Sequence, residues 1–122
     1  MLVVGGSVSA FDALHDIRLT AKLPIISSTR EQNALFGEAS FEHPDFDRRP
    51  AITSVGAETG RITFADGSFV DDVDSVLFAT GYDFQFPFLP NIQPRNQRIP
   101  GLYQHVFDRT DPTLAFIGMV SI

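Results

Sequence analysis

Small residues gather at the point where a short apolar run, residues 2–4, ends. The stretch VVGGSVSA, residues 3–10, places Gly5, Ser7 and Ala10 at the spacing of the G-x-G-x-x-G/A pattern. A turn of this kind lets the backbone approach a dinucleotide pyrophosphate, while free N–H groups and the positive end of the helix dipole face the anion. Because serine replaces the middle glycine, spacing alone leaves a plain tight turn into a helix as the alternative.

A second candidate lies about twenty residues further on, where a nucleotide site usually reads the adenosine ribose. An NAD site would offer an aspartate or glutamate at this point, whereas this chain offers Ser28, Thr29 and Arg30. The guanidinium of Arg30 is suited to a 2′-phosphate, and both hydroxyls can donate to the same group. This pattern favours NADPH over NADH; the alternative is a surface arginine that follows a strand.

The elements around these residues predict a βαβ unit with parallel strands. Residues 2–4 and 25–28 indicate two buried strands, and Ser7 or Ser9 is placed to cap the helix between them. Pro24 is expected to end that helix. Its apolar stripe recurs at helical spacing and comprises Ala10, Ala13, Leu14, Ile17 and Ala21.

The rest of the chain favours strands and loops. Residues 31–50 are expected to form a long loop with one helical turn, because apolar residues are scattered there. Alternating residues then predict an antiparallel meander, with Asp66 and Gly67 at a hairpin turn. Strands are expected at residues 52–55, 61–64, 69–70 and 73–79. A loop over residues 82–100 follows, and two short strands are expected at 102–107 and 114–120.

Composition narrows the function classes. The 122 residues suffice for one domain or a piece of one, and 43% hydrophobic and 20% charged residues indicate a globular protein. The net charge of −6 argues against a nucleic-acid partner, since Arg48, Arg49 and Arg61 are interspersed with acidic residues. No apolar run is long enough for a membrane span, and no targeting signal is recognised, so a cytoplasmic location is expected. Neither the acidic clusters nor the histidines have the spacing of a metal site or a catalytic triad.

Four further stretches carry a family resemblance: FATGYDFQFPFL (residues 78–89), GRITFADGS (60–68), GLYQHVF (101–107) and TLAFIG (113–118). Together they resemble the flavin-containing monooxygenase family, whose members carry an ATGY sequence after the NADPH domain. The resemblance covers nearly the whole chain, and the loop of residues 31–47 matches least.

The resemblance implies an α/β fold, with a Rossmann-like dinucleotide-binding unit, an antiparallel β-meander and a partial return to a flavin domain. Residues 1–81 would be a partial NADPH-binding domain with its meander at about 51–70, and residues 82–122 a return segment that packs on an FAD domain outside this chain. The implied cofactor contacts are Gly5, Gly6, Ser7, Ser9 and Ala10 for the pyrophosphate, Ser28, Thr29 and Arg30 for the 2′-phosphate, and Thr80 and Gly81 at the crossing between domains.

The resemblance also implies a chemistry. Such enzymes use NADPH to reduce FAD, whose site would lie mostly outside this chain, and pass one atom of molecular oxygen to a nitrogen or sulfur centre through a flavin C4a-hydroperoxide. No side chain of this chain is assigned a catalytic role, and the chain alone is expected to be inactive. Without a flavin domain, Phe84, Phe86 and Phe88 would form an apolar patch that favours association.

Two alternatives remain. The first is a truncated nucleotide-binding module without catalysis. The second is a relative of the pyridine-nucleotide disulfide reductases, which the absence of cysteine disfavours because most of them need a redox disulfide.

Overall fold

A computed structural model describes residues 1–34 and 36–118 of the chain. The chain divides into two compact units, Met1–Gly81 and Tyr82–Ile122, which we call the first and second units. Among the described residues, no helix is both long and apolar enough to span a membrane.

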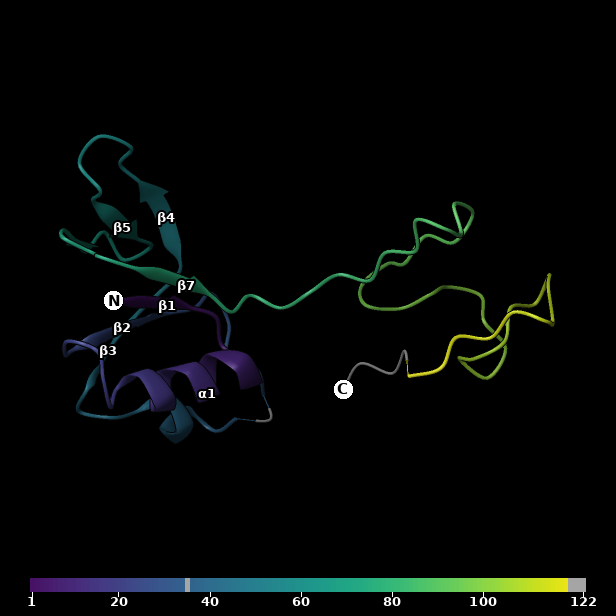
Figure 1. Cartoon of the computed structure of the whole chain (residues 1–122), viewed down its shortest axis with the longest axis horizontal. Coiled ribbons are helices and arrows are strands. Elements are labelled where there is room, and N and C mark those ends of the chain that lie inside the picture. Colours follow the sequence, from purple (N-terminus) through teal and green to yellow (C-terminus); the bar gives the residue numbers. More distant parts are fainter. Residues whose placement is uncertain (35, 119–122) are drawn as a thin grey trace. The chain divides into compact units, whose positions relative to one another are not determined.

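A parallel sheet forms the centre of the first unit (Figure 1). Its strands are β1 (Leu2–Val4), β2 (Ile25–Ser28), β3 (Phe46–Arg49) and β7 (Val76–Phe78), in the order β3-β2-β1-β7. Every neighbouring pair is parallel, with Leu2 aligned to Ile26 on one side and to Val76 on the other. The crossover from β1 to β2 contains α1 (Val8–Ile17), so this part is the predicted βαβ unit.

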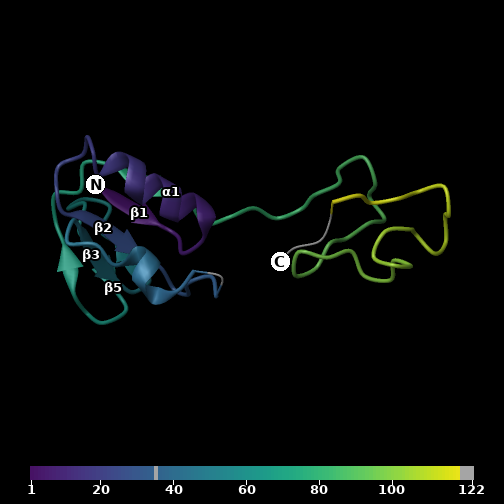
Figure 2. The same cartoon turned by 90° about the horizontal axis from the view of Figure 1, so that it is seen from below.

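The two faces of this sheet are covered by different layers, as Figures 1 and 2 show for α1 and the meander strands. Because side chains alternate along a strand, Val3 and Ile25 face α1 while Leu2 and Ile26 face the meander. The α1 side buries Ala10, Leu14, Phe41 and Phe46 with them. The fold is therefore α/β, with a helix on one face of a Rossmann-like sheet and an antiparallel sheet on the other.

The antiparallel meander confirms the sequence prediction. It consists of β4 (Ile52–Val55), β5 (Ile62–Phe64) and β6 (Phe69–Val70) in sequential order. The turn before β6 closes through the Gly67 N–H, which donates to the Phe64 carbonyl oxygen at 3.0 Å. Phe64 and Ile62 are buried against the parallel sheet, so the meander belongs to the core of the first unit.

The helix is shorter than its apolar stripe predicts. It ends at Ile17 rather than near Pro24. A tight turn follows, in which the Thr20 and Ala21 N–H groups both donate to the Ile17 carbonyl oxygen. Ala21 still packs against the core from this closing turn. The apolar spacing therefore identified residues that contact the core, and it overestimated the helix by one turn.

The predicted loop of residues 31–50 contains an unpredicted strand. The expected helical turn is present as a 3₁₀ helix, η1 (Glu38–Phe41), but residues 46–49 form β3 at the edge of the sheet. Only Phe46 of this strand is a buried apolar residue. Because an edge strand tolerates charged side chains, the sequence FDRR showed too little alternation to reveal it.

The last strand of the sheet, β7, is shorter and more exposed than the apolar run of residues 73–79 suggests. It spans Val76–Phe78, and Phe78 is 71% exposed. The reason is its position: β7 pairs with β1 on one side and occupies the other edge of the sheet.

The second unit consists largely of turns. In place of strands at 102–107 and 114–120, its described residues form isolated bridges, which pair Tyr103 with Phe107 and Phe107 with Ala115. Residues 119 and 120 of the second predicted strand lie outside the described residues. Phe86 packs edge-on against Phe116, with ring centroids 5.3 Å apart, and is half-buried, whereas Phe84 and Phe88 are exposed.

Candidate functional site

The candidate residues of the first unit lie at one edge of the parallel sheet. Because its four strands run in the same direction, their carboxyl ends meet there. β1 leads into the glycine turn (residues 5–7), β2 into Thr29 and Arg30, and β7 into Ala79 and Thr80. The structure thus brings together three segments that are far apart in the sequence.

Gly5 holds three strands close together. Its N–H donates to the Ser28 carbonyl oxygen at 2.9 Å, and the neighbouring Val4 carbonyl oxygen accepts from the Ala79 N–H at 2.7 Å. A Cβ at Gly5 would collide with the Ala79 carbonyl oxygen, and the φ angle of +149° is one that other residues rarely adopt. Only glycine fits this turn without a shift of the backbone.

Gly6 packs against the loop that follows β2. Its carbonyl oxygen accepts from the Asn33 N–H at 2.7 Å, and a Cβ would lie 2.5 Å from the Glu31 carbonyl oxygen and 2.6 Å from Thr29 Oγ1. The Asn33 side chain also donates to Ser7 Oγ at 3.0 Å. Asn33 therefore links the glycine turn to this loop, and no sequence motif pointed to it.

The N-terminus of α1 is open to an anion. Ser7 occupies the N-cap position, but its side chain does not cap the helix, contrary to the expectation for this residue. The first turn contains no acidic residue, so its unpaired N–H groups and the positive end of the helix dipole are not neutralised locally. Ser9 is exposed on this turn, whereas Ala10 is fully buried and packs close to Gly5.

The three residues predicted to read the ribose have different environments. Ser28 is completely buried, and its hydroxyl donates to the Pro50 carbonyl oxygen at 2.7 Å. Thr29 is half-buried, and its hydroxyl donates to the Glu31 carbonyl oxygen at 2.7 Å. Arg30 is exposed and makes no hydrogen bond or ion pair with any residue that the structure describes.

A cavity of about 400 Å³ opens beside these residues. Arg30, Arg48 and Arg49 line it, although in the sequence Arg48 and Arg49 are interspersed with acidic residues and no basic patch was predicted. The pairing of β2 with β3 explains this, because it aligns Arg48 with Ser27 and Arg49 with Ser28. None of the described residues that line the cavity is an aspartate or glutamate, which suits a negatively charged ligand.

The arginines differ in how firmly they are held. Arg49 binds Asp47 through two hydrogen bonds of 2.9 and 2.8 Å and lies 5.8 Å from the Phe64 ring centroid. The hydrogen bond to Asp47 raises the pKa of Arg49 above its usual value, so Arg49 is already committed to a partner.

The second unit contains another cavity, of about 570 Å³, with a different character. The described residues of its walls include Asp83 and several amides but neither arginine nor lysine, so this lining does not suit a phosphate. Gln97 donates to Asp83 Oδ1 at 3.1 Å and to the Tyr82 carbonyl oxygen at 2.7 Å beside it. At the boundary of the units, Thr80 is exposed and Gly81 has a φ of +85° with open space around it.

Comparison with known proteins agrees with this architecture. The model of the flavin-binding monooxygenase-like family matches residues 47–122, which is more than half of the chain. The chain belongs to this family.

Named relatives of the flavin-binding monooxygenase-like family match over most of the chain. The chain is 29% identical over 124 residues to flavin-containing monooxygenase FMO GS-OX-like 9 of Arabidopsis thaliana, and the match covers 98% of the chain and 26% of the relative. It is 34% identical over 124 residues to the trimethylamine monooxygenase of Methylocella silvestris, with the same two coverages. The chain thus spans about a quarter of the length of these relatives.

A solved structure has the same fold. Tmm from Pelagibacter sp. strain HTCC7211 matches with a TM-score of 0.76 at 22% identity, over 99% of this chain and 27% of that chain. The similarity confirms the α/β architecture described above.

Proposed function

We propose that this chain is the NADPH-binding part of an FAD- and NADPH-dependent monooxygenase that oxygenates nitrogen or sulfur centres. One observation carries the proposal: the glycine turn, the uncapped start of α1 and the exposed Arg30 lie at the same carboxyl edge of a parallel sheet. Dinucleotides bind at this edge in open α/β sheets.

The pyrophosphate would lie over the glycine turn. Gly5 and Gly6 keep Cβ atoms away from the turn, and the first N–H groups of α1 would donate to phosphate oxygens. The Ser7 hydroxyl oxygen accepts from Asn33, so its own hydrogen is free to donate to the same phosphate. Buried Ala10 allows the helix to pack closely on β1, which is the role of the last position of the pattern.

Arg30 would bind the 2′-phosphate, with Thr29 beside it. Arg30 has no competing partner among the described residues, and its forked guanidinium suits bidentate binding. Ser28 is buried, so we propose that it positions the end of β2 through Pro50 instead of touching the cofactor.

The described residues do not fit a second dinucleotide. They contain one glycine turn of this kind and one α-helix, α1, so we assign no step of the oxygenation to them. We propose that FAD, oxygen and the small-molecule substrate bind mainly to the rest of a longer cytoplasmic protein, with Thr80 and Gly81 at the crossing to it. Support comes from the relatives, of which this chain spans about a quarter, and from the name of one of them, trimethylamine monooxygenase.

The test is equilibrium binding of NADPH and NADH to the purified chain and to Arg30→Ala. A contact between an arginine and a phosphate contributes about 1.5 to 3 kcal/mol, which corresponds to a loss of about 10- to 150-fold in NADPH affinity. NADH affinity should stay unchanged. Arg61→Ala is the matched control, because it removes one positive charge from the first unit outside the cavity.

A folded chain that binds neither nucleotide would contradict the proposal. Because we propose that FAD binds mainly outside this chain, NADPH binding without FAD binding by the chain alone fits both this proposal and the alternative of a non-catalytic nucleotide-binding module.

A further inference from the structure

Arg48 reaches the candidate site from a strand that the sequence did not reveal. On β3, Phe46 and Arg48 share one face because they are two residues apart, and Phe46 is buried against the α1 side of the core. Arg48 therefore lies on the same side of the sheet as α1 and the loop after β2. Arg49 lies on the other face, beside Phe64 of the meander.

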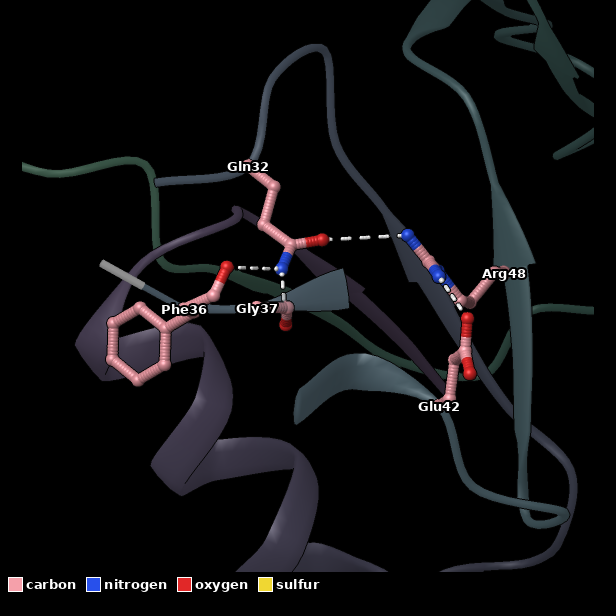
Figure 3. Close-up of polar contacts among 5 residues, drawn as sticks. All are labelled: Gln32, Phe36, Gly37, Glu42 and Arg48. Atoms are coloured by element: carbon pink, nitrogen blue, oxygen red, sulfur yellow. Dashed lines mark hydrogen bonds and ion pairs between the residues drawn. The ribbon is translucent and has the colours of Figure 1, made fainter. Parts of the chain in front are cut away.

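Gln32 connects this loop to Arg48, as Figure 3 shows. Its amide nitrogen donates to the carbonyl oxygens of Phe36 and Gly37, at 3.0 and 2.9 Å. These bonds turn the amide oxygen toward Arg48, whose Nη2 donates to it at 3.4 Å. On its other side, Arg48 Nη1 lies 3.4 Å from Glu42 Oε1.

The Arg48 contacts are weak enough to be exchanged for a phosphate. Charge-assisted hydrogen bonds are usually about 2.7 to 2.9 Å long, so both partners of Arg48 lie beyond that range. The side chain is 40% exposed, and it lines the same cavity as Arg30. Arg49 differs, because two short bonds already hold it to Asp47.

We propose that Arg48 is a second specificity-determining residue, which binds the 2′-phosphate of NADPH from β3 while Arg30 binds it from β2. Gln32 is a positioning residue that keeps Arg48 at the cavity. Glu42 is a competitor, since its carboxylate is displaced from Arg48 when the phosphate binds. The inference rests on the proposed NADPH-binding function.

The test measures the dissociation constants of NADPH and NADH for the intact chain and for Arg48→Ala, Arg48→Lys and Glu42→Gln. Arg48→Ala should weaken NADPH binding about tenfold, as expected for a partly exposed charge-assisted contact, and leave NADH binding within about twofold. Arg48→Lys keeps the charge but loses the fork, so a smaller loss is expected. Arg61→Ala, which removes a charge outside the cavity, should change neither constant.

Glu42→Gln separates cofactor binding from a structural role. Removal of a competing carboxylate should tighten NADPH binding about two- to threefold and leave NADH unchanged, whereas a purely structural ion pair predicts no gain. This variant also provides the test if Arg48→Ala does not fold.

The outcomes distinguish the two proposals. Suppose that the intact chain prefers NADPH, that Arg30→Ala abolishes this preference and that Arg48→Ala retains it. This result would overturn the proposed role of Arg48 and leave the proposed function standing. An intact chain without preference for NADPH would overturn both proposals. If Glu42→Gln does not tighten NADPH binding, the proposal that the Glu42 carboxylate competes with the 2′-phosphate for Arg48 is overturned.

Discussion

Replacement of Gly5 by alanine should destabilise the first unit more than replacement of any other turn glycine of this unit by alanine. The Cβ would collide with the Ala79 carbonyl oxygen, a backbone atom at the end of β7. The turn cannot move away freely, because the Gly5 N–H is bonded to Ser28 and Ala79 is bonded to Val4. The φ angle of +149° adds a conformational penalty.

The magnitude follows from these contributions. The unfavourable φ angle costs about 1 to 2 kcal/mol, and disruption of the two backbone hydrogen bonds adds about 1 kcal/mol each. We expect a loss of about 3 to 4 kcal/mol in the free energy of unfolding. For a unit of 81 residues, this lowers the Tm by at least about 12 °C, measured by circular dichroism.

Two controls separate the contributions. At Gly67, the φ angle of +81° is also positive but nothing lies within 4 Å of a Cβ, so Gly67→Ala should cost only about 1 kcal/mol. At Gly37, the φ angle is −59° and the space is also open, so Gly37→Ala should be neutral or slightly stabilising. If Gly5→Ala were no more destabilising than Gly67→Ala, the close approach of β7 to the glycine turn would be refuted as a constraint.

Two further predictions concern the surface. Arg61→Ala should raise the pKa of Asp71 toward its ordinary value of 3.8, because a hydrogen bond from Arg61 lowers that pKa. The stability that Asp71 contributes is fully present above pH 3.8 and is lost as the pH falls through its lowered pKa. An NMR titration of the carboxyl carbon can follow this pKa. An unchanged titration in Arg61→Ala would exclude the hydrogen bond in solution. In the second unit, Phe88 is 76% exposed, so the chain should self-associate through apolar residues, and Phe88→Asp should shift it toward monomer in size-exclusion chromatography. A chain that is already monomeric at high concentration would contradict this.

Local patterns were sufficient for much of the first unit. The apolar run of β1, the small residues at 5–10 and the stripe of α1 specify a βαβ unit, because each depends on periodicity and turn chemistry within a few residues. The alternation around Asp66 and Gly67 specified the meander for the same reason. Arg30 could be selected as a candidate, since its place after β2 follows from chain order alone.

The remaining features depend on which strands become neighbours. Pairing of β2 with β3 brings Arg48 and Arg49 to the wall of one cavity. The residue after β3, Pro50, accepts a hydrogen bond from the buried Ser28 hydroxyl. The contact of Asn33 with Ser7 likewise joins residues 26 positions apart. The sequence by itself determined the βαβ unit, the meander and the glycine turn, because local forces define them. Only the tertiary structure decided which arginines line the cavity and which are held in ion pairs, because both depend on the register between strands.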